Sequence, residues 1–317
     1  YASSMAIDLD IKYTIRNTES MENPVIINKK LPKINIGKMP IMLKSSICIL
    51  NQNKHIHPSL SDECEMDGGG YFVIKGSEKT VLGQERAAEN KVYCFNVSKN
   101  NTKYKWIAEI KSVPDFKSIS PKQINLMLQS KNNGFGNSIQ VQIPRVKNPI
   151  PLFIVFRALG IVSDKNICDI ILLDNYDKPD TPNNIILNLL KASLVESCDI
   201  QTEEEAFNYI KENVMFTPLN MDKETGEKKK TEFTKDVLNN DLFPHCHNIN
   251  QKIYFLGYMA KKILMADAGF ISQDDRDSYL NKRIDLTGTL LNNLFRNYFN
   301  KLVKDMQKMI IKEINTG

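Results

Sequence analysis

The sequence lacks the long apolar segments that mark membrane proteins. No run of about 18 or more apolar residues occurs, and no charged-apolar-small signal peptide opens the chain. Its composition, 42% hydrophobic and 25% charged, lies well outside the disordered range. We therefore expect a soluble globular protein that is not secreted, unless its native ends have been removed. A length of 317 residues allows one large domain or two of ordinary size.

Metal-ligand spacing is also missing. The six cysteines are dispersed without a CxxC pair, which favours reduced thiols in an intracellular protein over a disulfide framework. Residues 245–247 (His-Cys-His) and the group His55, His57 and Cys64 contain donor atoms that suit zinc. Neither group has the paired spacing of a structural zinc site, so we expect no metal at either place.

Catalytic signatures are equally scarce. The run Gly68-Gly69-Gly70 matches neither the GxxxxGK[ST] phosphate loop nor the GxGxxG dinucleotide motif. These glycines precede an apolar strand pattern, so they predict a turn. No Ser-His-Asp or Cys-His pairing stands out among only four histidines. The hypothesis of an unrelated nucleotide-binding enzyme has only the glycine run to support it.

Arginine is rare, with seven among the 42 basic residues. Lysine serves where a bare charge suffices, so arginine should persist where a planar, bidentate donor is needed. Chance placement is the alternative. Five arginines lie in or beside the motifs described below: Arg86, Arg145, Arg157, Arg276 and Arg283. The net charge of +5 permits contact with nucleic acid without requiring it.

Periodicity predicts a β-rich first part, up to about Trp106, followed by helices. Apolar residues recur every three to four positions at 184–197, 203–213 and 249–266. Residues 220–236 carry almost no apolar side chains and predict an exposed loop or hairpin.

The last segment, residues 285–314, predicts one long amphipathic helix. Its apolar stripe should pack into a core. Its lysine stripe should face either solvent or nucleic acid. The apolar stripe contains Leu290, Leu294, Tyr298, Leu302, Met306, Met309 and Ile310, and the lysine stripe contains Lys301, Lys304, Lys308 and Lys312.

Five colinear motifs carry a family resemblance. The two most specific are G-G-G-Y-F-V-I-K-G-S-E-K at 68–79, running on to Q-E-R at 84–86, and D-D-R-D at 274–277, followed by N-K-R-I-D-L-T-G at 281–288. The others are I-G-K-M-P-I-M-L-K-S at 36–45, F-R-A-L-G-I at 156–161 and F-L-G-Y-M at 255–259. Together they resemble the second-largest subunit of multisubunit DNA-dependent RNA polymerases, the counterpart of the bacterial β subunit. The eukaryotic, archaeal and large-DNA-virus branch is the most similar.

The resemblance implies an α+β fold of two domains. Residues 1–105 and the helix at 281–317 would form the domain called the protrusion, a mixed domain built from both chain ends. Residues 106–280 would form an inserted α+β lobe.

The resemblance also implies a role in transcription as part of a nucleotidyltransferase. The chain would form one wall of the DNA cleft, contact downstream DNA and the fork, and present the lobe to initiation factors. Its partners would be DNA, bound non-specifically, together with the largest subunit and other subunits, and no membrane. The active centre and its Mg²⁺ would lie outside this stretch, in a polymerase located in the nucleus, or in the cytoplasm if viral. The alternative is a free-standing, non-catalytic interaction module derived from that subunit.

Candidate DNA-binding residues follow from the motifs. In bacterial relatives, the positions that match Arg86 and Asp277 contact a non-template base near the downstream fork. Lys282 and Arg283 match the basic pair after the acidic cluster, and the predicted set is completed by Lys79 and Gln84. Two residues depart from the family pattern: Ser278 replaces a histidine, and Leu280 replaces a glycine. Both replacements affect the local backbone, on which a base contact by Asp277 depends. We expect the Gln84–Arg86 segment to lie beside the start of the long helix, with Arg86 and Asp277 within roughly 15 Å, near enough for both to touch one nucleotide step.

The acidic cluster at 274–277 allows two interpretations. Clustered carboxylates bind Mg²⁺ in two-metal catalysis. The family places its catalytic aspartates in the largest subunit, so we expect a salt-bridge cluster that caps the long helix instead.

Overall fold

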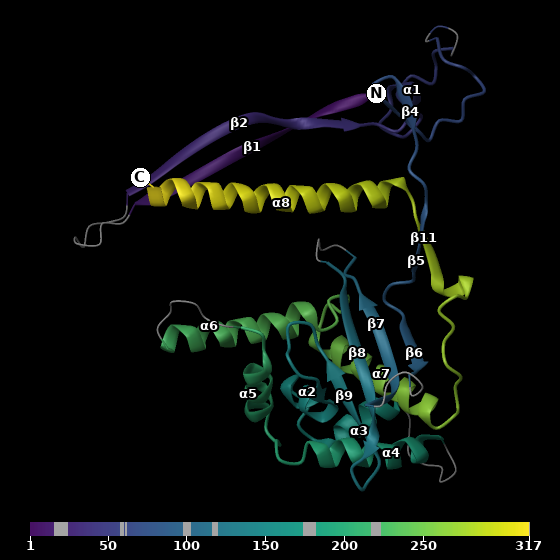
Figure 1. The fold of residues 1–317 in the computed structure, drawn as a ribbon, viewed down its shortest axis with the longest axis vertical. Helices are drawn as coiled ribbons and strands as arrows, with labels where there is room; N and C mark the ends of the chain where they lie inside the picture. The colour runs from purple at the N-terminus through teal and green to yellow at the C-terminus, as the bar shows by residue number, and fades with distance from the viewer. Residues whose placement is uncertain are drawn as a thin grey trace. The chain divides into compact units, whose positions relative to one another are not determined.

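The computed structural model describes residues 1–15, 25–57, 60, 62–97, 103–115, 120–173, 182–216 and 223–316. The chain divides into two compact units (Figure 1). Unit 1 contains Tyr1–Glu85 and Ile284–Gly317, and unit 2 contains Arg86–Arg283. Helices and sheets occur together, which confirms the α+β class. In the described part of the chain, no helix is long and apolar enough to cross a membrane.

A long antiparallel hairpin opens unit 1. Strand β1 (Ala2–Ile15) pairs with β2 (Val25–Pro40), with Ile7 opposite Ile34. Along β1, half-buried and exposed residues alternate from Met5 to Ile11, because successive side chains of a strand point to opposite faces. A short helix α1 (Ile49–Gln52) and a small hairpin of β3 (Phe72–Ile74) and β4 (Ser77–Lys79) follow.

Unit 1 also contains the long helix α8 (Thr287–Thr316). It begins two residues later than the sequence pattern suggests, because Asp285 still belongs to strand β11 (Lys282–Asp285). None of its described residues is buried, and Leu302 is 50% exposed. The prediction that its apolar stripe packs into a core is therefore wrong for the described chain. Helical periodicity fixes which face is apolar, but it does not supply a partner for that face.

Unit 2 is built on a five-stranded antiparallel sheet in the order β10-β9-β8-β7-β6. The strands are β6 (Val92–Asn96), β7 (Tyr104–Ser112), β8 (Lys122–Asn132), β9 (Asn137–Gln142) and β10 (Ile150–Pro151). In β7, Trp106, Ala108 and Ile110 are buried and alternate with partly exposed residues, so one face of the sheet covers the core.

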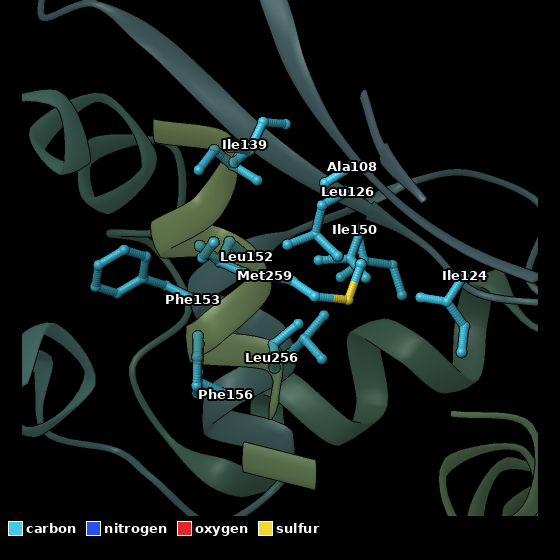
Figure 2. Packing of buried hydrophobic residues seen from close by; sticks show 14 of the residues in the cluster. Ala108, Ile124, Leu126, Ile139, Ile150, Leu152, Phe153, Phe156, Leu256 and Met259 are labelled. Carbon is cyan, nitrogen blue, oxygen red and sulfur yellow. The ribbon is translucent and has the colours of Figure 1, made fainter. Parts of the chain in front are cut away.

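Helices complete the core of unit 2. They are α2 (Leu152–Ala158), α3 (Asp164–Leu172), α4 (Pro182–Glu196), α5 (Glu203–Asn213), α6 (Lys223–Asp236) and α7 (Ile249–Asp267), with a π-helix at Val237–Asp241. Helices α2, α4 and α7 pack on the sheet, α7 on β6, β7 and β8 and α4 on β9, whereas α3, α5 and α6 pack on other helices. Figure 2 shows Met259 and Leu256 of α7 among Leu126 and Ile150 of the sheet. The predicted helices at 184–197, 203–213 and 249–266 are thus confirmed.

The loop or hairpin predicted at 220–236 is wrong for residues 223–236, which form α6; residues 220–222 lie outside the described residues. Lysine and glutamate are good helix formers, and hydropathy alone does not register this propensity. The helix is held by a few contacts: Thr234 is buried, and Glu227 pairs with Lys211 of α5 at 2.8 Å.

The chain passes from unit 1 to unit 2 at Glu85–Arg86, earlier than the boundary near residue 105 that the sequence suggests. Residues 92–96 form β6, which pairs along its length with β7, so they belong with the sheet of unit 2. The assignment of these units to protrusion and lobe stays a prediction.

Candidate nucleic-acid interface

The two most specific motifs meet in a two-stranded sheet. Strand β5 (Gln84–Ala87) is hydrogen-bonded to β11 (Lys282–Asp285), although nearly 200 residues separate them in the sequence (Figure 1). The Gln84–Arg86 segment thus lies beside residues 282–285, which form a strand before the long helix and not its first turn. A spacing within roughly 15 Å between the Arg86 and Asp277 side chains, near enough for both to touch one nucleotide step, stays a prediction.

Unit 2 contains four of the six predicted residues: Arg86, Asp277, Lys282 and Arg283. Arg86 is half-buried, and its guanidinium lies 3.3 Å from the Glu89 carboxylate. Arg283 is exposed and donates to the main-chain oxygens of Lys282 at 2.7 Å and Leu280 at 3.4 Å. The structure thus places the cations of β5 and β11 on neighbouring strands.

The charge of Arg283 acts on the hydroxyl of Tyr93 in β6. Burial raises the pKa of the Tyr93 hydroxyl, and the Arg283 guanidinium opposes that rise. The amino group of Lys91 lies 5.9 Å from the centre of the same ring. The carboxylates of Asp274 and Glu109 also act on this hydroxyl and raise its pKa, so cations and acids lie together around the buried tyrosine on β6.

The acidic cluster at 274–277 makes its hydrogen bonds and ion pairs with residues of unit 2. One Asp274 oxygen accepts hydrogen bonds from the Cys94 amide and from Lys262 Nζ, each at 2.8 Å. Arg276 pairs with Glu109 at 3.1 Å and lies 4.0 Å from the Phe95 ring centre.

The prediction of a cap on the long helix is therefore wrong. The cluster's ion-pair partners lie on β7 and α7, and α8 has no acidic residue in its first turn. The cluster does not fit Mg²⁺ either, because Asp274 is held by a lysine and Asp275 accepts from the Asp277 amide at 2.9 Å. Across the described residues, no group of three or more His, Cys, Asp or Glu side chains could hold a metal ion.

The remaining two predicted residues belong to unit 1. Lys79 is exposed at the end of β4, opposite Phe72, and Gln84 is exposed at the start of β5. Asp277, in unit 2, is also exposed and precedes a 3-10 turn at Tyr279–Asn281.

The glycine run forms a structural turn in unit 1. Gly69 has a φ of +68°, and a Cβ there would lie 2.6 Å from the Leu43 carbonyl oxygen. The Gly70 amide donates to that oxygen at 3.0 Å, and the Gly69 amide donates to the Asp67 carboxylate at 2.8 Å. Both amides are therefore engaged within the protein, and the run does not cradle a phosphate.

Asp67 holds this turn together. The Tyr71 hydroxyl donates to its carboxylate at 2.6 Å, which lowers the pKa of Asp67 and raises that of Tyr71 to about 12. The run at 36–45 and the glycine motif thus meet around Leu43 for structural reasons.

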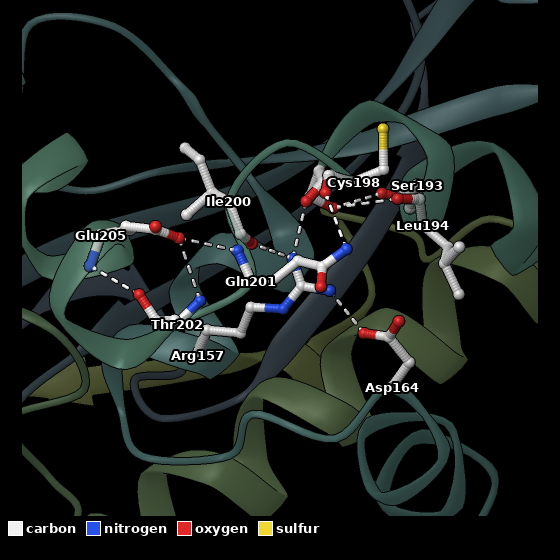
Figure 3. Close-up of polar contacts among 10 residues, drawn as sticks. Arg157, Asp164, Ser193, Leu194, Cys198, Ile200, Gln201, Thr202 and Glu205 are labelled. Carbon is white, nitrogen blue, oxygen red and sulfur yellow. Dashed lines mark hydrogen bonds and ion pairs between the residues drawn. The ribbon is translucent and has the colours of Figure 1, made fainter.

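The F-R-A-L-G-I motif is also structural. Arg157 on α2 is buried and donates to the Ser197 carbonyl at 2.6 Å, to the Ile200 carbonyl and to Asp164 at 2.5 Å (Figure 3). It fastens the loop between α4 and α5 to α2 and α3. This role agrees with the expectation that arginine persists where a forked donor is needed.

Sequence reasoning gave no role to Lys91, Tyr93 or Asn281, although they surround the basic residues of β11. Lys91 Nζ donates to Asn281 Oδ1 at 2.5 Å. The only sequence signal was the position of Asn281 directly before the Lys282–Arg283 pair.

Comparison with known proteins gives a consistent result. The family model described as RNA polymerase beta subunit matches residues 1–317. The chain is 34% identical to DNA-directed RNA polymerase II subunit 2 of Arabidopsis thaliana, over 100% of the chain and 26% of the relative. It is 35% identical to subunit RPB2 of Encephalitozoon cuniculi, with the same coverage. It is 31% identical to the archaeal subunit Rpo2N of Methanococcus vannielii, over 89% of the chain and 53% of the relative. The chain thus spans about a quarter of the length of the first two relatives.

Proposed function

The chain belongs to the RNA polymerase beta subunit family, and on that basis we propose that it works within the second-largest subunit of a DNA-directed RNA polymerase. Unit 1 would be the protrusion and unit 2 the lobe, flanking the DNA cleft. The other polymerase subunits would be its permanent partners, and the lobe would receive initiation factors. The relatives named for polymerase II favour a nuclear site, with the cytoplasm as the viral alternative.

The observation that carries a DNA contact is the pairing of β5 with β11, which brings Arg86 and the Lys282–Arg283 pair onto neighbouring strands. Such cations bind phosphates and position DNA without reading its sequence. Asp277, on the loop before β11, would accept a hydrogen bond from a base amino or imino group.

This chain's role in nucleotidyl transfer would be to hold DNA. As the family resemblance implies, the Mg²⁺ of the whole polymerase would be held by residues of the largest subunit. That ion supplies charge stabilisation for phosphoryl transfer when it is bound. The residues of this chain would restrain the phosphate backbone through Arg86, Lys282 and Arg283.

The test is DNA binding by the full chain over a range of salt concentrations. Fluorescence anisotropy with a labelled forked duplex should give a Kd no tighter than about 10⁻⁵ M at physiological salt, as expected for non-specific contact. Arg86→Gln, Lys282→Gln and Arg283→Gln should each reduce the slope of log K against log salt by about 0.9.

The matched control is Lys165→Gln, which removes one exposed positive charge from α3 of the same unit. It should leave the slope unchanged. If the three variants bind as tightly and with the same salt dependence as this control, the proposed DNA contact is wrong. Nucleotide titration, which we expect to show no binding, tests the remaining possibility of a nucleotide-binding protein.

A further inference from the structure

The segment that leads into β11 is fastened to the edge of the unit 2 sheet. Strand β6 is the last strand of that sheet, so one of its edges has no strand partner among the described residues. Asp274 occupies part of this edge: its amide donates to the Cys94 carbonyl at 2.9 Å, and its carboxylate accepts from the Cys94 amide at 2.8 Å. Lys262 on α7 reinforces the contact by donating to both Asp274 and the Val92 carbonyl.

Asn281 makes a second attachment. It is 8% exposed, and its side chain both accepts from Lys91 Nζ at 2.5 Å and donates to the Asp275 carbonyl at 2.7 Å. Its own carbonyl accepts from the Ala88 amide at 2.8 Å. One residue thus links the start of β6, the loop that follows Asp274 and the end of β5.

The position of these bonds matters because Ala88 directly follows β5 and Asn281 directly precedes β11. The Ala88–Asn281 bond therefore closes one end of the two-stranded sheet. A register shift of one residue in a strand turns every side chain to the opposite face. Holding Asn281 in place thus determines which face presents Lys282 and which presents Arg283.

We propose that Asn281, supported by Asp274, is a positioning residue that sets the register of β11 against β5. The orientation of the basic pair for DNA, as a consequence of this register, rests on the proposed function. Asparagine suits the role because the site needs one acceptor, for Lys91, and one donor, for the Asp275 carbonyl. An aspartate would keep the first contact and lose the second.

The test compares Asn281→Ala and Asn281→Asp in the full chain with Asn137→Ala. Asn137 is a matched control, because its amide donates to the main-chain carbonyls of Gln129 at 2.6 Å and Ser130 at 3.2 Å in the same unit. Amide hydrogen exchange is followed in peptides that cover residues 84–88 and 282–285. Both Asn281 variants should exchange at least about tenfold faster there, and Asn137→Ala should not.

A second readout separates positioning from general destabilisation. Trp106, the single tryptophan, lies in β7 of unit 2, so its fluorescence reports the unfolding of that unit. Asn281→Ala should lower the salt slope of DNA binding toward that of Arg283→Gln, whereas an Asn137→Ala chain of similar unfolding midpoint should bind like the unmodified chain.

Two outcomes overturn different statements. Unchanged exchange at 84–88 and 282–285 in Asn281→Ala overturns the positioning role, even if Arg283→Gln weakens DNA binding. Faster exchange together with unaltered DNA binding by Arg86→Gln, Lys282→Gln and Arg283→Gln leaves the register role standing and overturns the proposed DNA contact.

Discussion

At the scale of single residues, Arg157 shows how one side chain holds several segments of unit 2. Its guanidinium reaches two carbonyls of the α4–α5 loop and the Asp164 carboxylate. The sequence predicted a fork-like use for this arginine. It could not predict the partners, because Ser197 and Ile200 lie about 40 residues away and carbonyl groups carry no sequence signal.

Replacing Arg157 with alanine should destabilise unit 2 by about 2–4 kcal/mol, because the buried carbonyls lose their donor. Arg276→Ala is the matched control: its side chain is 64% exposed, so the loss should stay below about 1 kcal/mol. Denaturant unfolding followed by Trp106 fluorescence measures both. Equal losses for the two variants would contradict the structural role of Arg157.

His245 predicts a pH dependence of stability. Burial, followed by the charge of Lys252, lowers the pKa of the His245 ring, while Asp115 opposes and His247 adds to this effect. The unfolded chain then binds a proton at higher pH than the folded chain does. Stability should therefore fall as the pH decreases from about 6.5 toward the lower folded value.

The measurement is the unfolding midpoint of unit 2 between about pH 5 and 7, above the range in which ordinary carboxylates titrate. His245→Asn keeps a polar group beside Ser112 Oγ, which lies 2.6 Å from His245 Nδ1, and removes the titration. The variant should show a shallower pH dependence. An unchanged profile would exclude His245 as its source.

At the scale of elements, the sequence predicted helices whose ends are encoded locally. Helix α5 begins with a capping box in which the Glu205 amide donates to Thr202 Oγ1 and the Thr202 amide donates back to Glu205, each at 3.2 Å. Helix α6 was missed because it has few apolar residues. The exposure of α8 could not be predicted, because an apolar stripe does not reveal what covers it.

Gly257 in the F-L-G-Y-M motif marks the close crossing of α7 and α3. A Cβ at this position would lie 2.9 Å from the Ile170 carbonyl oxygen, whereas a Cβ at Gly288 of α8 meets nothing within 4 Å. Gly257→Ala should therefore cost about 1–3 kcal/mol. Gly288 lies in the first turn of α8, so Gly288→Ala should change the stability by no more than about 0.5 kcal/mol. Thermal melting by far-ultraviolet circular dichroism measures both, and stabilisation by Gly257→Ala would contradict the described packing.

Two leucines contrast the helices of the two units. Leu256 of α7 is fully buried, and Leu302 of α8 is half exposed. Leu256→Ala should cost about 2–5 kcal/mol, and Leu302→Ala less than about 1 kcal/mol. Chemical denaturation followed by circular dichroism tests this difference. A comparable cost at Leu302 would show that α8 is covered in solution.

At the scale of the whole molecule, the family could be identified from the sequence because five motifs occur in one order. Most of these motifs prove structural: Gly69, Arg157 and Gly257 each satisfy a local packing or hydrogen-bonding demand. The boundary between the units at Glu85–Arg86 was harder to locate, because β6 is a strand like the elements before it and its partner β7 lies later in the sequence. The contacts of Asp274 and Asn281 depend on residues about 180 positions away, so no local pattern indicated them.

The chain alone should not polymerise nucleotides, because the family places its metal-binding aspartates in the largest subunit, outside this stretch. Template-directed incorporation by the purified 317-residue chain should equal the background without protein. The assembled polymerase serves as the positive control. Incorporation above background, retained after further purification, would show that an active centre had been overlooked.

The central claim is that the paired strands β5 and β11 present cations to DNA. The most direct test places a photo-crosslinking residue at Arg86, Lys282 or Arg283, one at a time, in the assembled polymerase stalled on a forked template. The account predicts DNA adducts from these positions and none from Lys165 on α3. If none of the three positions forms an adduct with DNA while the polymerase remains bound to the template, the claim is contradicted.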